Sequence, residues 1–154
     1  IYIMKKDVVR YGNGILKSPG MRRERKYIQH SNISCYTHSV NVAALSIAIS
    51  RFFGFKVDER SMVRGALLHD YFLYDWHLKR PPQGLHGFVH AKIALRNAER
   101  DFSLNDIERD IISKHMFPLN IKPPKYKESF IVCLADKLCA LKETLSKYRA
   151  KVNA

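Results

Sequence analysis

Residues 40–53 place apolar side chains on two faces of a single helix, and no other part of the sequence constrains the fold as strongly. The spacing is three and four residues, with one face formed by Val40, Ala43, Ala44, Ile47 and Ala48 and a second by Leu45, Ile49 and Phe53. This spacing matches the period of an α-helix, whereas a half-buried strand would alternate every second residue. A helix that is apolar on two faces is expected at the centre of a bundle.

Similar spacing predicts further helices, separated by turns, caps and the pairs Pro81-Pro82 and Pro123-Pro124. Asp58 is a candidate N-cap for a helix that ends at His69-Asp70. Later helices are expected at about 88–101, from the capping-box-like segment 103–106 to about 115, and at about 126–147. The last of these has an apolar side formed by Ile131, Leu134, Ala135, Leu138, Leu141 and Leu145.

Strand-like alternation is absent, so the sequence predicts an all-α fold with one bundle of six or seven helices. We expect this helical domain at residues 31–154, with a basic amino-terminal segment, residues 1–30, packed on it or flanking it. A chain of 154 residues is long enough to bury the core of one such domain.

The apolar runs and cysteines predict a cytoplasmic protein. No run approaches the roughly 20 apolar residues that cross a membrane, and residues 1–7 lack the apolar core of a signal peptide. The three cysteines, Cys35, Cys133 and Cys139, form no CxxC motif, and we expect free thiols in a reducing compartment. The oligomeric state stays open.

The charge of the chain is strongly positive, with 27 Lys and Arg against 14 Asp and Glu and a formal net charge of +13. Such a field attracts phosphate groups on nucleotides, nucleic acid or lipids. The basic stretches lack the interleaved aromatic residues typical of single-strand-binding surfaces. A small phosphorylated ligand is therefore favoured over nucleic acid, and a merely solvated basic face stays open.

His69 and Asp70 directly follow the run Gly65-Ala66-Leu67-Leu68. Neighbouring helical residues point about 100° apart, so both side chains reach one ion only near a helix end or bend. The sequence supplies further ligand types at His38, His86, His90, His115 and Asp136. Imidazole and carboxylate together suit Mn, Fe, Co, Ni or Zn, and sites without cysteine also take Mg. The sequence thus predicts a metal site.

Each of these residues also has an ordinary explanation when it is taken alone. Asp136 lies in an apolar helix and is open to pairing with Lys137. His115 is open to capping the carboxyl end of a helix, where positive charge is favourable. His38, at the start of a buried helix, is consistent with a hydrogen-bonded core histidine. Because all these explanations would have to hold together, a shared metal site is favoured.

The order of these residues resembles the HD superfamily of metal-dependent phosphohydrolases. The resemblance spans roughly residues 34–145 and rests on His38, on His69-Asp70 after Ala66-Leu67-Leu68, on a later histidine pair, and on Asp136 in Ala135-Asp136-Lys137. It implies that His38, His69, Asp70 and Asp136 bind one ion. It further implies that His90 and His115 hold a second ion, with His86 either replacing His90 or lying behind it. Two such ions, about 3.5–4 Å apart, clamp the attacking and leaving oxygens of a phosphoester.

The segment after His69-Asp70 departs from the family pattern. Many members carry Lys or Glu shortly after the pair, where this chain has Tyr71-Phe72-Leu73. Beside the catalytic Asp70, we expect Asp75 or His77 to donate a proton, although Asp75 is also consistent with a solvent-facing or capping carboxylate. Basic side chains are expected to hold phosphate oxygens, namely Lys79, Arg80 and Lys137.

The predicted function is metal-dependent hydrolysis of a phosphate ester of a nucleotide or a related small molecule, with one or two divalent ions. Two alternatives stay open. One is an HD-type oxygenase with mixed-valent iron, and the other is a non-catalytic basic protein that binds nucleic acid and uses its metal structurally. Steep salt dependence of binding without phosphatase activity would favour the second alternative.

Overall fold

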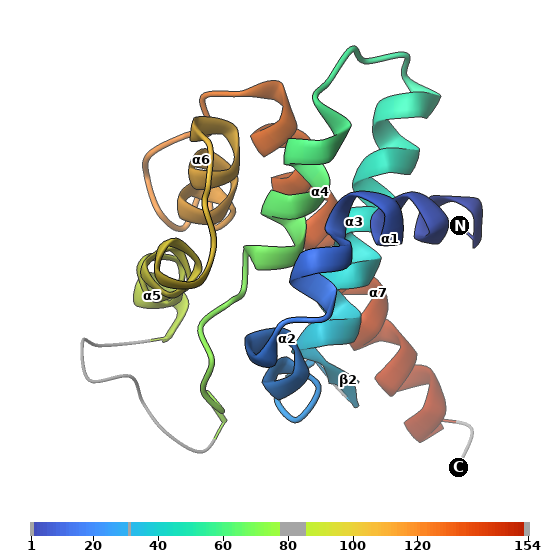
Figure 1. Cartoon of the computed structure of the whole chain (residues 1–154). Helices are drawn as coiled ribbons and strands as arrows, with labels where there is room; N and C mark the ends of the chain where they lie inside the picture. The colour runs from blue at the N-terminus through green and yellow to red at the C-terminus, as the bar shows by residue number, and fades with distance from the viewer. Residues whose placement is uncertain (1, 31, 78–85, 153–154) are drawn as a thin grey trace.

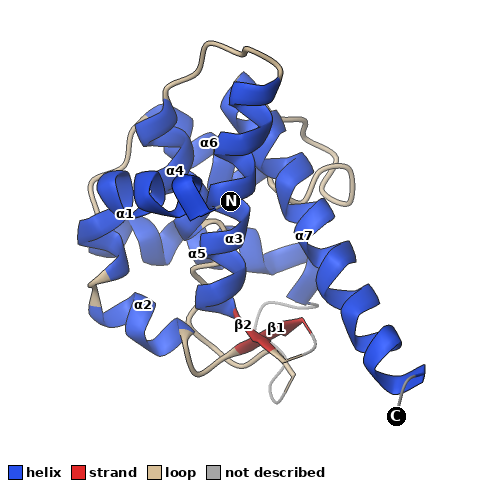
Figure 2. Cartoon of the chain, turned by 90° about the vertical axis from the view of Figure 1, so that its right-hand side faces the viewer, coloured by secondary structure: helices blue, strands red, loops and turns tan. Residues whose placement is uncertain are grey.

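The computed structural model describes residues 2–30, 32–77 and 86–152 (Figure 1). These residues form seven helices and two short strands: α1 (Tyr2–Leu16), α2 (Pro19–Glu24), β1 (Ile28–His30), β2 (Ile33–Ser34), α3 (Cys35–Phe52), α4 (Glu59–Leu68), α5 (His86–Asp101), α6 (Asp106–Lys114) and α7 (Lys127–Val152). The predicted all-α bundle is confirmed. The strands pair antiparallel in a small hairpin that the sequence did not predict (Figure 2).

Helix α3 is the centre of the bundle, as its two apolar faces predict, but Phe53 of the second face follows the helix and is exposed. The helix packs against α1, α4 and α7, and Val42, Ala43 and Ile47 are completely buried. Helix α6 covers the opposite side of α4, and α5 packs against α6 (Figure 1). The amino-terminal segment joins this bundle because α1 buries Val8 and Ile15 against it.

Local caps set the helix ends that matter for the site. Asp58 caps α4 by accepting a hydrogen bond from Ser61 N at 3.0 Å, as predicted. Helix α4 ends at Leu68, so His69 and Asp70 lie at a helix end rather than within a helix. The predicted cap of α6 was wrong by two residues. Asn105 caps the helix, because Glu108 rather than Asp106 reaches back to close the capping box.

The apolar side predicted for α7 was wrong in part. Ile131, Val132, Ala135 and Cys139 face the bundle, whereas the leucines at 134, 138, 141 and 145 are exposed. The reason is geometric: α7 packs on α3, α4 and α6, and the four exposed leucines lie away from these helices. When a helix has two apolar faces, the periodicity of its sequence does not predict which face is buried in the core. All three cysteines are free, as predicted, and all three are buried.

The helices of the described residues include none that is both long and apolar enough to span a membrane.

Gly20 on α2 makes the closest approach of backbone to a buried ring. A Cβ at this position would overlap the phenol of Tyr71. Tyr71 is buried and its hydroxyl donates to Asp101 Oδ2 at 2.9 Å, so the ring has little freedom to move. We expect Gly20→Ala to lower the free energy of unfolding by about 1–3 kcal/mol in denaturant titrations, as overpacking does.

Gly14 on α1 supplies the matched control for this substitution. A Cβ there would meet no atom within 4 Å. Gly14→Ala is therefore expected to raise the unfolding free energy by about 0.5–1 kcal/mol, the helical advantage of Ala over Gly. Equal effects of the two substitutions would contradict this account of Gly20.

Candidate metal centre

Five separate helices bring the predicted ligands to one buried point. His38 lies in the first turn of α3, and His69 and Asp70 follow the last residue of α4. His90 lies on α5, His115 follows α6, and Asp136 lies on α7. All six residues are at most 9% exposed. His38 and Asp136, which are 98 positions apart in the sequence, therefore contact each other in the interior.

A first group gathers around Asp136. Its Oδ1 atom lies 3.0 Å from His38 Nε2 and 3.5 Å from His69 Nε2. The Oδ2 atom of Asp70 lies 3.2 Å from His69 Nε2 and 3.9 Å from His38 Nε2. Two imidazole nitrogens and two carboxylate oxygens thus face one another.

A second group gathers around the other oxygen of Asp70. Its Oδ1 atom lies 3.3 Å from His90 Nε2 and 3.4 Å from His115 Nε2, and these two nitrogens are 2.8 Å apart. The two oxygens of Asp70 therefore face different histidine pairs. Asp70 is shared between the groups.

Hydrogen bonds to main-chain carbonyls define the tautomer of three histidines. The Nδ1 atoms of His69, His90 and His115 lie 2.7, 2.8 and 2.9 Å from the carbonyl oxygens of residues 66, 86 and 112. A carbonyl only accepts, so each Nδ1 carries the proton and donates. In the neutral ring each Nε2 then presents a lone pair to the centre, which is the arrangement of a metal-binding histidine.

Some polar atoms of the centre have no hydrogen-bond partner among the described residues. His69 Nε2 and Asp70 Oδ1 are buried without a well-aligned hydrogen bond. His90 Nε2 and His115 Nε2 face each other as two acceptors when both rings are neutral. Buried acceptors that converge in this way need a cation or additional protons between them. The donor set is nitrogen and oxygen only, and it fits divalent ions of the predicted classes.

The pKa shifts of the clustered histidines and aspartates also favour a site that binds a cation. Burial opposes protonation of His38, but hydrogen bonds to Asp136 and Glu143 outweigh it and raise its pKa to about 9. Burial likewise raises the pKa of Asp136, yet His38 and His69 lower it below its usual range. Burial together with neighbouring rings lowers the pKa of His115. Protons and cations compete for such a cluster, so metal affinity should rise with pH.

Two residues that support the ligands were missed in the sequence. Glu143 Oε2 accepts from His38 Nδ1 at 2.9 Å, which leaves His38 Nε2 for the centre. Gln29 donates to Asp70 Oδ2, while its Oε1 accepts from Cys35 and Trp76. Glu143 lies seven residues after Asp136 on α7, so helical periodicity could have placed both on one face. No sequence signal marks Gln29.

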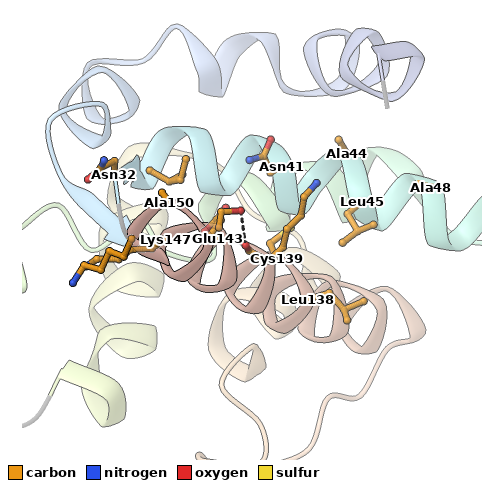
Figure 3. A pocket seen from close by; sticks show the side chains of 14 residues that line it. Asn32, Asn41, Ala44, Leu45, Ala48, Leu138, Cys139, Glu143, Lys147 and Ala150 are labelled. Atoms are coloured by element: carbon orange, nitrogen blue, oxygen red, sulfur yellow. Dashed lines mark hydrogen bonds between the residues drawn. The ribbon is translucent and has the colours of Figure 1, made fainter. Parts of the chain in front are cut away.

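One cleft of about 290 Å³ opens onto the metal centre. Its polar lining includes Asp70, His90, His115 and Asp136, and His30 lies at the same opening. Its apolar walls are formed by residues such as Trp76, Met116 and Leu119. A larger cavity of about 710 Å³ lies between α3 and α7, and Figure 3 labels Asn41, Cys139 and Glu143 among its lining residues. None of the six candidate ligands lines that larger cavity. The cleft of about 290 Å³ is therefore the candidate substrate site.

The structure separates His86 from the metal-ligand groups. Its ring stacks on His90 at 4.5 Å, and its Nδ1 atom lies 2.7 Å from the hydroxyl of Tyr74. Burial and the neighbouring His90 lower the pKa of His86 to about 4. His86 thus stacks on His90 outside the two groups, and which of these two histidines binds an ion stays a prediction.

Of the predicted catalytic and phosphate-binding residues, some line the cleft and others do not. Asp75 Oδ1 accepts from His77 N at 3.0 Å in a local turn, and neither residue lines the cleft. This position matches the capping alternative for Asp75. Lys137 does line the cleft, and its Nζ donates to the His115 carbonyl at 3.0 Å and contacts Cys133 Sγ. Lys79 and Arg80 fall outside the described residues.

Comparison of the sequence with models of known protein families identifies the family of this chain. The model of the HD domain matches residues 35–141. The chain belongs to the HD domain family. Members of the HD domain family are generally metal-dependent phosphohydrolases, and the matched region contains all six residues of the metal centre described above. Searches of curated proteins and of solved structures found no match.

Proposed function

We propose that this HD domain binds two divalent cations and hydrolyses a phosphate ester of a small molecule. The observation that carries the proposal is the position of Asp70, whose two carboxylate oxygens face two different pairs of imidazole Nε2 atoms. A carboxylate shared in this way is suited to bridge two ions.

The ligands divide between the two ions according to these contacts. His38, His69 and Asp136 would hold the first ion with Asp70 Oδ2, and His90 and His115 would hold the second with Asp70 Oδ1. When bound, the ions supply Lewis acidity toward phosphoryl oxygens and toward water. Cys133 Sγ donates to the carbonyl of His115 instead of facing the ions, so none of these ligands is a sulfur atom.

The residues around the cleft would orient the substrate. Lys137 Nζ is held by the His115 carbonyl and Cys133, and a third N–H is left for a phosphoryl oxygen. The ring of His30 packs edge-on against His38 at 5.3 Å and offers a polar group at the opening. A cleft of about 290 Å³ lies at the lower end of ordinary ligand sites, roughly 300–1,000 Å³. These features favour a small phosphorylated substrate such as a nucleotide.

The number of bound ions tests the division of ligands. Protein purified without chelator is expected to contain two ions per chain by mass spectrometry of the metals. His90→Ala should reduce this to one, because it removes a ligand from the second ion only. His86→Ala is the matched control and should leave two ions, since His86 bonds Tyr74 instead of facing Asp70. Loss of an ion from the His86 variant alone would reverse the assignment.

The reaction itself is tested by a phosphatase screen with Mn, Co, Ni, Fe and Mg added separately. The panel includes nucleoside monophosphates, cyclic dinucleotides and p-nitrophenyl phosphate. Metal-dependent release of phosphate or of a nucleotide is expected for at least one substrate. Iron-dependent consumption of oxygen without hydrolysis would instead favour the oxygenase alternative.

A further inference from the structure

The outer face of α7 carries a continuous row of exposed large apolar residues. The row consists of Leu134, Leu138, Leu141, Leu145 and Tyr148, which are between 43 and 66% exposed. Single exposed apolar residues are ordinary on protein surfaces. A contiguous row of them along one helix marks an interaction surface.

The spacing of this leucine row is that of a coiled-coil seam. Successive members are separated by four, three, four and three residues. This alternation places Leu138 and Leu145 at a positions and Leu134, Leu141 and Tyr148 at d positions of a heptad repeat. A strict a and d pattern is the narrow seam that packs against one other helix, and is narrower than the face of a helix buried in a globular core.

The charges beside the row have one sign. The three acidic residues of α7, Glu128, Asp136 and Glu143, are buried in the bundle. The basic residues of α7 are exposed, namely Lys127, Lys137, Lys142, Lys147, Arg149 and Lys151. In the heptad register Lys142 and Arg149 occupy e positions and Lys151 occupies a g position. Lys137 is also at a g position, but its ammonium group is held by the His115 carbonyl beside the metal cleft. The e and g positions select the partner in a coiled coil.

A second copy of this chain is a poor partner for the row. Two copies of α7 would place basic e and g residues next to one another in either a parallel or an antiparallel pair, and like charges at these positions disfavour pairing. The net charge of +13 adds to the repulsion. A helix with acidic e and g residues would pair with Lys142, Arg149 and Lys151.

The carboxyl-terminal part of α7 has little other packing. Residues 144–151 are all exposed, and Figure 2 shows this end of α7 leaving the rest of the bundle. Isolated helical turns are marginally stable in water, and most helices depend on packing of an apolar face. A partner helix along the row would supply that packing.

We propose that the outer face of α7 binds an amphipathic helix of a partner protein, with leucine-like residues at its a and d positions and Glu or Asp at e and g. The metal ligand Asp136 and its supporting residue Glu143 lie on the buried face of α7. Docking on the outer face therefore leaves the metal centre intact.

The proposal is tested with two synthetic helical peptides of three heptads, both with Leu at a and d. One carries Glu at every e and g position and the other carries Lys. Binding to the full 154-residue chain is measured by fluorescence anisotropy. The Glu peptide is expected to bind at least about tenfold more tightly, and its advantage should fall as salt increases. Equal affinity for the two peptides, or no binding of the Glu peptide, would overturn the proposal.

Substitutions in the chain locate the binding. Leu141→Gln with Leu145→Gln should abolish binding of the Glu peptide, whereas Phe52→Gln with Phe53→Gln, which changes exposed residues outside the row, should leave it unchanged. Lys142→Glu, Arg149→Glu and Lys151→Glu together should reverse the preference toward the Lys peptide. Circular dichroism and the metal content of each variant separate loss of binding from loss of fold.

The chain without peptide is examined by analytical ultracentrifugation. A monomer is expected over the micromolar range. A dimer that is lost in the Leu141 and Leu145 variant would show that a second copy occupies the row, and would overturn the choice of an acidic partner.

Discussion

Asp70→Asn is expected to remove both metal ions and to reduce phosphatase activity at least about 1,000-fold, which corresponds to about 4 kcal/mol of lost transition-state stabilisation. The reason is that each oxygen of Asp70 faces a different histidine pair. An amide keeps the size of the side chain but loses the charge that both ions require. Metal content and the rate of hydrolysis are measured on the same preparation.

Asp106→Asn provides the control for this substitution, since Asp106 is exposed at the start of α6 and pairs with Arg109. This variant should retain both ions and full activity. If the Asp70 variant instead kept one ion with the wild-type affinity, the shared role of Asp70 would be wrong. Two independent mononuclear sites would then be the better description of the centre.

Glu24→Gln is expected to stabilise the protein strongly at alkaline pH and only slightly at acidic pH. Glu24 is 2% exposed, and its Oε1 accepts from Leu73 N at 3.3 Å. Burial, with a further contribution from the charge of Asp70, raises the pKa of Glu24 to about 8. The folded protein therefore holds this carboxyl group in its neutral form at a pH where the unfolded chain has released the proton.

The sign of the effect follows from this difference in proton binding. The folded pKa exceeds the unfolded value of 4.5, so the contribution of Glu24 to stability is complete below pH 4.5 and is lost as the pH rises toward 8. The advantage of the Gln variant should grow by about 4 kcal/mol between pH 5 and pH 9. Urea unfolding at each pH measures it, with chelator present so that metal occupancy does not vary.

Glu99→Gln is the matched control for the pH experiment. Glu99 lies on the surface of α5 and pairs with Arg109, so its substitution should produce a difference that is almost independent of pH. A flat profile for the Glu24 variant as well would contradict the account of Glu24 as a buried neutral acid.

The helices from α3 onward could largely be predicted from the sequence because their signals are local, whereas α1 and α2 were not predicted. Apolar spacing, Asp58 as a cap and the proline pairs depend on neighbouring residues only. The cap of α6 was misplaced by two residues, since Ser103 and Asn105 are both good caps and the contact with Glu108 decides between them. The hairpin of β1 and β2 was missed because its strands of three and two residues are too short for alternation to be recognised.

The types of candidate ligand were also visible in the sequence, because His38, His69, Asp70 and Asp136 supply imidazole and carboxylate groups in an order that resembles the HD superfamily. Which oxygen of Asp70 faces which histidine was not visible. That assignment depends on how α4, α5, α6 and α7 pack. The hydrogen bonds of Gln29 and Glu143 also join residues from different elements, and local spacing carries no information on such contacts.

The sequence by itself determined that this chain forms a helical domain with a histidine and aspartate site, since helix periodicity and ligand chemistry depend on residue type and order. Only the tertiary structure decided that Asp70 is shared between two groups, that His86 stacks on His90, and that the leucines of α7 face outward. The physical reason is that burial and distance arise from the packing of whole helices. Helix α7 has apolar residues on two faces, and its packing against the other helices determines which face is buried.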